Sequence, residues 1–302
     1  MIMNLIARRS NSSGHFFRML LATLTLALGG CANLNQSTPA PPSPPALSRE
    51  AITDILASPD RRTADRNNDI RRKPDQMLAF IGVRPGMVAL DLSAGGGYTT
   101  ELIARAVGPA GRVYGQSAPR AADTRPPAAP EGAASPPAPS ASALPAVTPA
   151  AAARQTSVQA LADRARNPRL ANIVPLLRKF EDPLPPELAP GGLDLVTLMF
   201  NYHDLGHMGV DRAQMNRAVF AGLKKGGLYV IADHSGRAGT AISESGTLHR
   251  IEEAFLRQEV EAAGFQLAAE GNFLRNPADP RDKNTPDPAQ AKDGFVLKFI
   301  KP

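Results

Sequence analysis

Residues 88–100 read VALDLSAGGGYTT, and this stretch decides the fold. Its first five residues are apolar apart from Asp91, as in a short buried strand, and three consecutive glycines follow at 95–97. An amphipathic helical pattern then runs over residues 99–107. A strand, a glycine turn and a helix start bring backbone amides to one point, and glycine permits a close approach because it has no Cβ. The stretch therefore predicts a site for a ligand with polar groups.

Strand and helix patterns alternate over the rest of the chain. The further strands that we expect lie at 112–115, around Ile173, at 193–200, at 228–233 and, as a closing pair, at 265–270 and 294–300. The further helices that we expect lie at 49–57, at 75–82, from Ser157, at 211–223 and at 247–263. This alternation predicts a largely parallel sheet, and the closing pair predicts an antiparallel edge. The chain is therefore expected to form a doubly wound, Rossmann-like α/β domain.

Positive charge is concentrated in two places. The chain has a net charge of +6, of which three arginines in residues 1–30 supply half. Residues 60–76 hold five arginines and one lysine, and we expect a helix with a solvated charged face there. The alternative is a lid in which Arg66 or Asp69 closes over a ligand. With no Trp and few Tyr, the basic excess gives no case for a nucleic-acid partner.

The first 46 residues are expected to be a targeting segment and a tether. Residues 1–30 combine arginines with the apolar run MLLATLTLAL, which is short for a membrane span and predicts a signal peptide. The run ends in LGGC, which resembles the lipobox of bacterial lipoproteins and implies lipidation of Cys31. The alternative is a leftover buried thiol beside an uncleaved anchor. Residues 31–46 are rich in proline and serine, as in an extended tether.

The folded domain is expected to span residues 47–302. Within it, residues at about 118–155 are almost entirely Ala, Pro, Ser and Thr. Such a segment lacks the large apolar side chains that offset ordering entropy, so we expect a disordered insertion. Cys31 is the only cysteine, so no disulfide is expected. A lipid on Cys31 would anchor the domain to a membrane of the bacterial cell envelope, facing the periplasm.

The glycine loop does not fit a dinucleotide site. Read as G-x-G-x-x-G from Gly95, it has Thr100 at the third glycine position. A dinucleotide site also needs an acid about 20 residues further on, at the end of the second strand, where this chain has Gln116 and Ser117. The acid here is Asp91, on the strand before the loop, which suits a ligand that carries positive charge. An NAD-type cofactor is therefore disfavoured.

Three motifs occur in order along the chain, AGGGYTT at 94–100, NYHD at 201–204 and TLHRI at 247–251. With these motifs, residues 72–300 resemble the class I S-adenosylmethionine (SAM)-dependent methyltransferases, in particular a bacterial group of predicted methyltransferases that are often exported. The resemblance implies the seven-stranded methyltransferase sheet with an antiparallel edge strand, SAM as cofactor and a small-molecule acceptor. The residues that it places around the cofactor are Asp91, Ser93, Ala94, Gly95, Gly96, Gly97, Gln116, Glu181, Asp182 and Asn201.

The resemblance matches some of these residues to particular parts of the cofactor. It implies that Asp91, Ser93, Gly95 and Gly97 line the methionine part. Glu181 and Asp182, after the third strand, match the acid that contacts adenine in related enzymes. The acid that holds the ribose hydroxyls in the family, at the end of the second strand, is replaced by Gln116. Glutamine offers a donor and an acceptor but no charge. This departure affects the expected affinity for the cofactor rather than the fold.

The NYHD motif supplies the candidate catalytic residues, because the carboxyl end of a parallel strand faces the crevice of such a fold. We expect His203 to be the base that takes a proton from the acceptor, since an ordinary histidine pKa lies near neutral pH. Asp204 is expected to orient His203 or to bind an acceptor amine. The alternative is that Asn201 and Asp204 cap the following loop and His203 is a structural hydrogen-bonding residue. Asp233 and His234 have a similar position and a weaker case.

The spacing of the other candidate ligands predicts no metal site. His203 and His207 are four residues apart, but Gly206 and the surrounding loop argue against a shared helical face. His249 and Arg250, at the start of the last expected helix, are expected at the surface or in packing.

The sequence thus predicts an exported, lipid-anchored, SAM-dependent methyltransferase. The rival hypothesis is a non-catalytic lipoprotein that uses the same fold to bind a small ligand. The expected export favours this hypothesis, because SAM is a cytoplasmic cofactor and an exported domain would not be in the same compartment. Gln116 and the insertion beside the pocket favour it too.

Overall fold

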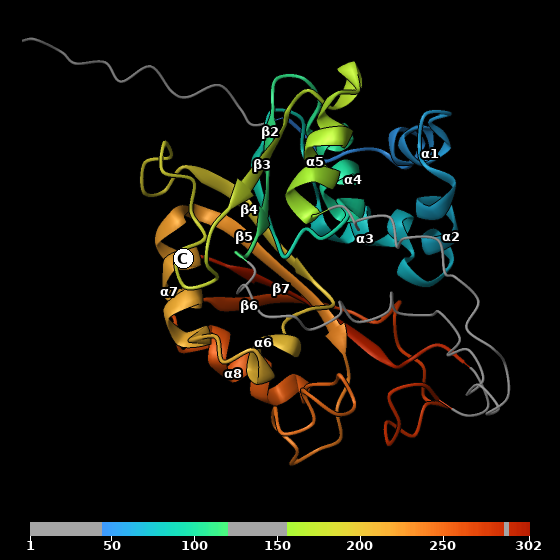
Figure 1. The fold of residues 1–302 in the computed structure, drawn as a ribbon, viewed down its shortest axis with the longest axis vertical. Coiled ribbons are helices and arrows are strands. Elements are labelled where there is room, and N and C mark those ends of the chain that lie inside the picture. The colour runs from blue at the N-terminus through green and yellow to red at the C-terminus, as the bar shows by residue number, and fades with distance from the viewer. Residues whose placement is uncertain (1–43, 120–155, 287–289) are drawn as a thin grey trace, which may run out of the picture. The chain divides into compact units, whose positions relative to one another are not determined.

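A seven-stranded sheet forms the centre of the domain, in the order β3-β2-β1-β4-β5-β7-β6 (Figure 1). The strands are β1 (Val88–Leu92), β2 (Arg112–Ser117), β3 (Ile173–Leu177), β4 (Leu193–Met199), β5 (Leu223–His234), β6 (Gln266–Gly271) and β7 (Gly294–Ile300). Strands β1 to β5 are parallel, and β7 pairs antiparallel with both β5 and β6. The expected doubly wound sheet with an antiparallel pair at one edge is confirmed, with β7 one place in from the edge strand β6.

The computed structural model describes residues 44–119, 156–286 and 290–302. The expected signal peptide, Cys31 and most of the tether lie outside these residues. So does the expected insertion at 118–155, apart from its first two positions. Within the described ranges, none of the helices combines the length and apolar character that a membrane span requires.

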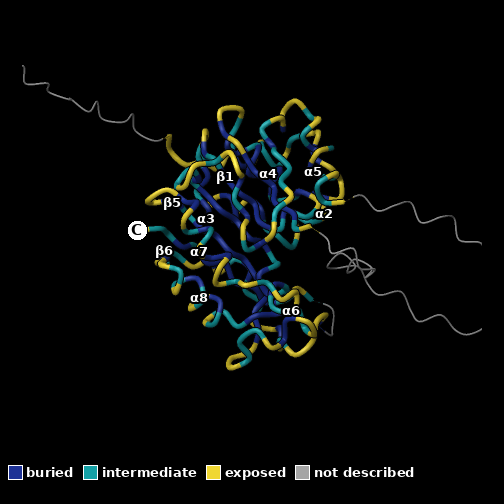
Figure 2. Tube along the Cα trace, turned by 60° about the vertical axis from the view of Figure 1, so that its left-hand side comes forward, coloured by how far each residue is buried: buried dark blue, intermediate teal, exposed yellow. Residues whose placement is uncertain are grey.

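Helices cover both faces of the sheet, and each face has its own apolar core. The helices are α1 (Arg49–Ala57), α2 (Thr63–Arg72), α3 (Pro74–Ile81), α4 (Tyr98–Val107), α5 (Ser157–Ala165), α6 (Asp204–His207), α7 (Arg212–Gly222) and α8 (Glu253–Glu261), with a short 3₁₀ helix at Pro168–Leu170. One core joins α1, α3, α4 and α5 to one face of the sheet, and the other joins α6, α7 and α8 to the opposite face. Figure 2 shows the buried strands between more exposed outer segments.

Alternation along the strands divides the apolar residues between these two cores. In β1, Ala89 belongs to the first core and Leu90 and Leu92 belong to the second. Successive strand residues point to opposite faces, so a strand that is covered on both sides is apolar almost throughout. This accounts for the near-continuous apolar runs of β1 and β4.

The topology places a crevice at the carboxyl ends of β1 and β4. These strands are neighbours, with Asp91 opposite Thr197, although β2 and β3 lie between them in the sequence. The chain winds from β1 toward β3 on one side and from β4 toward β5 on the other, so the connections diverge at this point. Ligands of doubly wound folds bind at such a switch point. The glycine loop after β1 and the NYHD motif after β4 both reach it.

Two expectations for the helices were wrong. The helix predicted at 247–263 is confined to α8, because residues 250–252 extend along the end of β5. Ile251 there donates to the carbonyl of His234 at 3.1 Å and accepts from the amide of Gly236 at 2.7 Å. His249 has a φ of 51°, which an α-helix does not permit. The second error concerns α2, because Asp65 is buried and pairs with Arg164, and Asp69 pairs with the buried Arg61, so these side chains do not form a solvated face.

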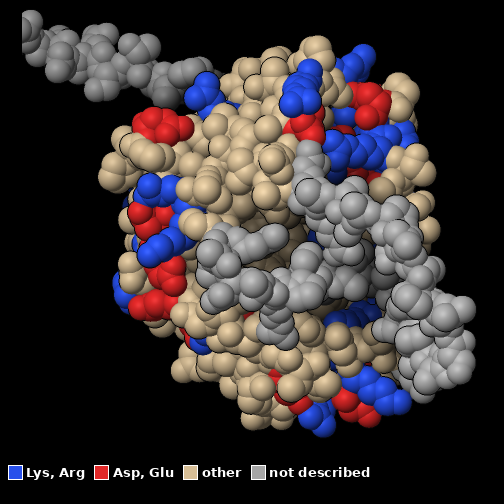
Figure 3. Space-filling view, viewed as in Figure 1, with Lys and Arg blue, Asp and Glu red and all other residues tan. Residues whose placement is uncertain are grey.

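On the face seen in Figure 3, basic and acidic side chains are interspersed around the rim.

Candidate cofactor site

The loop after β1 is held in a left-handed conformation that bends it toward the switch point. Ser93, Gly95 and Gly97 have φ values of 54°, 54° and 84°. Positive φ suits glycine and is strained for serine. Gly97 precedes the first residue of α4, so the loop presents the start of that helix to the crevice. The strand–loop–helix arrangement predicted from residues 88–100 is confirmed.

Gly97 is required by packing on the far side of the loop. A Cβ at this position would lie 2.8 Å from Cδ of Arg164 and 2.9 Å from Cδ2 of Leu161, both on α5. The Nε of Arg164 donates to the carbonyl of Gly96 at 2.6 Å. The glycine loop is therefore clamped by α5 from behind, which leaves its other side to the crevice.

Asp91 is a buried carboxylate at the base of the crevice. Thr100 donates to its Oδ2 at 2.6 Å and Thr197 donates to its Oδ1 at 2.8 Å. Burial raises the pKa of Asp91 to about 6, against the two threonine hydrogen bonds, which lower it. A carboxylate has about four acceptor positions, so these two bonds leave it capacity for a cationic group or a water.

A cavity of about 580 Å³ lies beside this loop. Its size falls within the usual range for small-molecule sites, which is about 300–1,000 Å³. Seven of the sequence-predicted site residues line it, namely Asp91, Ser93, Ala94, Gly95, Gly96, Asn201 and Asp204. The cavity is therefore formed jointly by the glycine loop of β1 and the NYHD motif of β4.

Four predicted cofactor residues do not line the cavity. Gly97 faces α5, as described above. Gln116 is fully buried, and its side chain accepts from the amide of Ser93 at 2.9 Å and donates to the carbonyl of Arg178 at 2.7 Å. Glu181 accepts from the amide of Asp211, and Asp182 forms an ion pair with Arg178. Both polar groups of Gln116 are therefore engaged within the protein, so its role here is to hold the loop.

Helix α2 supplies cavity residues that the sequence analysis missed. Asp65, Asn68, Arg71 and Arg72 line the cavity, whereas the two residues of the lid hypothesis do not. Asp69 accepts from Arg61 and from the hydroxyl of Tyr98, and Arg66 donates to two carbonyls of the preceding segment. No local signal marks the four residues, because only the packing of α2 beside α4 and α5 brings them to the site.

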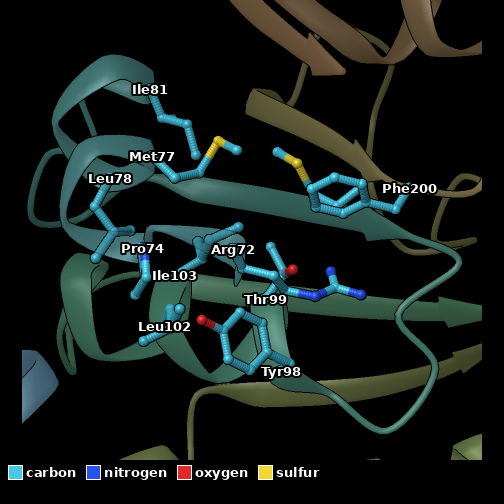
Figure 4. Close-up of a pocket in the computed structure, with 11 residues that line it drawn as sticks. Arg72, Pro74, Met77, Leu78, Ile81, Tyr98, Thr99, Leu102, Ile103 and Phe200 are labelled. Carbon is cyan, nitrogen blue, oxygen red and sulfur yellow. The ribbon is translucent and has the colours of Figure 1, made fainter. Parts of the chain in front are cut away.

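Arg72 lies at the junction of the cavity with a small apolar cavity of about 20 Å³ that is lined mainly by α3 and α4. Figure 4 shows the side chains of α3 and α4 around this small cavity, with the guanidinium of Arg72 extending past it toward Phe200. Cζ of Arg72 lies 4.6 Å from the ring centroid of Phe200 and 5.4 Å from that of Tyr98. Contacts of this kind between a guanidinium and aromatic rings are attractive, and they fix the two rings at the rim.

The arginine cluster, which we define as Asp65, Glu101, Arg105 and Arg164, supports the loop, and its members Asp65 and Arg164 also border the cavity. Arg164 binds Asp65 through both terminal nitrogens, at 2.7 and 3.1 Å, and also pairs with Glu101. Glu101 in turn accepts from Arg105 at 2.8 Å. The side chains of Arg164 and Glu101 are each 4% exposed. The cluster joins α2, α4 and α5 into one support for the glycine loop.

The histidine cluster, which we define as His203, Asp204, His207, Asp233 and His249, lies on the other side of the switch point. Nδ1 of His203 is 2.5 Å from Oδ1 of the fully buried Asp233. Nε2 of His203 is 3.1 Å from Oδ1 of Asp204, and Nδ1 of His249 is 2.6 Å from the same oxygen. His207 is more distant, with Nδ1 at 3.7 Å.

His203 is not placed as a free base. Burial lowers its pKa, but the carboxylates of Asp233 and Asp204 outweigh burial and raise the pKa from 6.5 to about 10. The imidazole is therefore cationic at neutral pH without a ligand, contrary to the expectation of an ordinary histidine pKa. His203 is also 1% exposed, whereas Asp204 reaches the cavity. Asn201 donates to Oδ2 of Asp204 at 3.1 Å.

Two further residue pairs, Asp233 with His234 and His249 with Arg250, had weaker predictions and lie in different surroundings. Asp233 accepts from the backbone amides of His203 and His234, each at 2.8 Å, in addition to the imidazole of His203. Arg250 is fully buried and pairs with Asp279 at 2.8 Å, which is the packing role expected for it. His249, its neighbour, belongs instead to the histidine cluster.

Comparison with known proteins finds similarity only at the level of structure. No protein-family model matches the sequence, and no curated protein gives a match. A SAM-dependent methyltransferase from Aquifex aeolicus is 14% identical over 85% of this chain and 100% of that chain, with a TM-score of 0.51. An arsenic(III) SAM methyltransferase from Chlamydomonas reinhardtii is 17% identical over 87% and 74% of the two chains, with a TM-score of 0.48. Fibrillarin from Aeropyrum pernix, solved with natively bound SAM, is 18% identical over 72% and 68%, with a TM-score of 0.40.

At this level of identity, the likeness to the Aquifex protein concerns the fold. The domain has the Rossmann-like fold of SAM-dependent methyltransferases, with its seven strands and antiparallel β7.

Proposed function

We propose that this protein is a SAM-dependent methyltransferase that acts on a small-molecule acceptor. The observation that carries the proposal is the cavity of about 580 Å³ at the switch point, lined by both the glycine loop and Asp204. The fold alone would leave the ligand open, since one fold serves many functions. The position of this cavity and the charged groups in its lining narrow the range of ligands that it could bind.

The residues around the cavity fit the charges of SAM. The methionine part of SAM carries an ammonium, a carboxylate and a sulfonium. Asp91 offers the ammonium a carboxylate, and Arg71 and Arg72 place guanidinium groups at the wall of the same cavity. The rings of Tyr98 and Phe200 add an apolar surface on which an adenine can stack. We therefore assign Asp91, Ser93 and residues 94–96 to the cofactor.

Methyl transfer depends chiefly on the alignment of its reactants. When bound, SAM would supply an electrophilic methyl group. The chain contributes the rigid loop that fixes one reactant and the carboxylate of Asp204 at the opposite wall, where it can orient a donor group of the acceptor. The cationic ring of His203, with Nε2 at 3.1 Å from Oδ1 of Asp204, attracts that carboxylate and so acts as a positioning residue.

A second cavity provides space for the acceptor. It has a volume of about 230 Å³ and shares Arg71, Arg72 and Phe200 with the first. Its described lining includes five residues with cationic side chains, Arg71, Arg72, Lys73, Arg275 and Lys292, and no carboxylate. Arg275 is paired with Glu253 at 2.6 Å, and the other four cationic residues favour an acceptor that carries negative charge.

Calorimetric titration of the full chain with SAM and with S-adenosylhomocysteine (SAH) tests the proposal. We expect one site for each compound, and we expect Asp91→Asn to weaken SAM and SAH to a similar extent, because both compounds carry the ammonium that Asp91 would bind. Asp75→Asn is the matched control, since Asp75 is exposed on α3 and does not line the cavity. Absence of binding at millimolar SAM would contradict the proposal.

The second candidate, a non-catalytic ligand-binding protein, is favoured by Gln116. Its side chain is occupied by Ser93 and Arg178, so the end of β2 presents no acid for a ribose. The two candidates differ in turnover. The chain is incubated with SAM and a bacterial small-molecule extract. If the chain is an enzyme, the rate of SAH formation should exceed that of the Asp91→Asn variant. Tight binding without SAH formation would support the second candidate.

We also propose that the chain is a lipoprotein of the bacterial cell envelope, anchored through Cys31 and facing the periplasm. The support is the sequence of residues 1–31, with its arginines, apolar run and LGGC ending. Cys31→Ser should abolish acylation and move the protein from the membrane fraction to the soluble fraction. Retention of the variant in the membrane fraction would contradict the lipid anchor.

A further inference from the structure

Three side chains from two distant parts of the sequence converge at the edge of the cavity. Oδ1 of Asp204 lies between Nε2 of His203, at 3.1 Å, and Nδ1 of His249, at 2.6 Å. One ligand atom from each residue lies within 4.8 Å of the other two. Two imidazoles and one carboxylate form a donor set that binds divalent transition metals such as Zn²⁺ or Fe²⁺ in other proteins.

We propose that His203, Asp204 and His249 form a binding site for a divalent transition-metal ion. The sequence gives no indication of it, because His249 lies 45 residues from Asp204. The structure brings the two together by holding His249 in a left-handed conformation at the end of β5. The proposal does not depend on the proposed methyltransferase activity.

The surroundings of His203 match those of a metal-bound histidine. Such a histidine usually donates its second ring N–H to a carboxylate, which fixes the tautomer and the direction of the ring. Nδ1 of His203 contacts Asp233, and two backbone amides hold that carboxylate in place. With Nδ1 protonated, Nε2 directs a lone pair at the site. Asp204 and Asp233 together would balance the two charges of the ion.

The ligand atoms lie within 4.8 Å of one another, and their spacing can be compared with that around a bound ion. In a tetrahedral site with metal–nitrogen and metal–oxygen distances of about 2.0–2.1 Å, neighbouring ligand atoms lie about 3.3 Å apart. Nε2 of His203 already lies 3.1 Å from Oδ1 of Asp204. The contact of His249 with Asp204 must widen, and both side chains are partly exposed, at 29% and 24%. The buried member, His203, can therefore stay in place while the other two move.

The position of the site gives it access to the ligand cavity. Asp204 lines the cavity of about 580 Å³, and the other two ligands, which do not line it, contact Asp204. Three protein ligands leave a tetrahedral ion one further position, as in catalytic rather than structural zinc sites. That position is open to water or to an oxygen of a ligand in the cavity.

Metal titration tests the site directly. The full chain is purified without a polyhistidine tag, treated with a chelator and titrated with Zn²⁺ by calorimetry and with Co²⁺ by visible absorption. We expect one ion per chain and a Co²⁺ spectrum of tetrahedral type. Asp204→Asn and His249→Gln should each weaken Zn²⁺ binding by at least about 100-fold, and Asp233→Asn should weaken it by about 10–100-fold.

His234→Gln is the matched control. The ring of His234 lies 5.8 Å from that of His203 but offers no atom to the three-residue set, so this variant should bind Zn²⁺ like the unmodified chain. His249 is partly exposed, so its variant should stay folded even if Asp204→Asn does not, as circular dichroism will show. Equal Zn²⁺ affinity in the unmodified chain and in His249→Gln would overturn the proposal.

Discussion

The two charged clusters on either side of the switch point differ in what their charges are free to do. In the arginine cluster, the guanidinium of Arg164 keeps its charge at any relevant pH, and Asp65, Glu101 and the carbonyl of Gly96 satisfy its donors. In the histidine cluster, two imidazoles share one oxygen of Asp204, which also reaches the cavity. Asp65 and Arg164 also border the cavity, but their charges are satisfied within the first set, whereas the imidazoles of the second set can release a proton to a ligand.

The difference implies that the arginine cluster supports the structure of the site and that the histidine cluster takes part in ligand binding. A buried arginine with satisfied donors costs much to disturb and gains nothing from a ligand. An imidazole can exchange its proton for a metal ion, so its cluster has two alternative states. We therefore expect substitutions in the arginine cluster to reduce stability and substitutions in the histidine cluster to change binding.

The largest loss of stability should come from Arg164→Ala. It removes the partner of two buried carboxylates, Asp65 and Glu101, and breaking a buried pair in this way costs about 3–5 kcal/mol. Urea unfolding measures the loss. Arg166→Ala, two positions further along the chain, is the control, because its side chain is 80% exposed. Equal losses in both variants would remove the basis of the comparison.

Gly97→Ala should have the next largest effect. Its positive φ costs about 1–2 kcal/mol for alanine, and the contact of the new Cβ with Arg164 and Leu161 adds about 1–3 kcal/mol. Gly82→Ala has a similar φ, 74°, with no atom within 4 Å of the new Cβ. The difference between the two variants in urea unfolding therefore isolates the contact with α5. No difference would mean that α5 yields to the methyl group.

Binding of SAM should weaken at acidic pH because of Asp91. Its pKa is raised to about 6, and only the ionised carboxylate attracts the ammonium of the ligand. The affinity should be constant at neutral pH and fall by up to about tenfold for each pH unit below 6. Calorimetry over this range measures the effect, and the affinity of Asp91→Asn should stay flat. The stability of the ligand-free protein has the opposite pH dependence, because the raised pKa of Asp91 favours its protonated form. The stabilisation by that form is lost as the pH rises through 6.

The smallest effect on stability should come from His249→Gln. The substitution removes one partly exposed contact with Asp204, which is worth about 1 kcal/mol or less. Urea unfolding in the presence of a chelator measures it. The same variant should lose the stabilisation that Zn²⁺ gives the unmodified chain. A loss of stability as large as that of Arg164→Ala would mean that the histidine cluster is structural.

Local patterns predicted the parts of the site that are close in sequence. The run from Val88 to Thr100 fixed the first strand, the loop and the next helix, and the NYHD motif was expected at the crevice, where Asn201 and Asp204 lie. Asp91 needed no distant partner to be recognised, because its strand and its loop adjoin.

The parts that failed depend on contacts between distant segments. Asp65 pairs with Arg164 across 99 residues, including residues 120–155, so α2 reads as a solvated helix in isolation. The ordinary pKa assumed for His203 was wrong because Asp233, 30 residues further along the chain, contacts its ring. Burial and long-range pairing determine both the environment of α2 and the pKa of His203. Neither effect leaves a periodic pattern or a fixed spacing in the sequence.

The side chain of Gln116 works as a crosslink between three neighbouring strand ends. It ties the amide of Ser93, after β1, to the carbonyl of Arg178, after β3, from its own place in β2. The glycine loop is thus ordered before any ligand arrives, and the entropy of ordering it belongs to folding rather than to binding. A ligand that shifts the loop would also pull on the hydrogen bond between Gln116 and Arg178. The segment after β3 is therefore coupled to a cavity that it does not line.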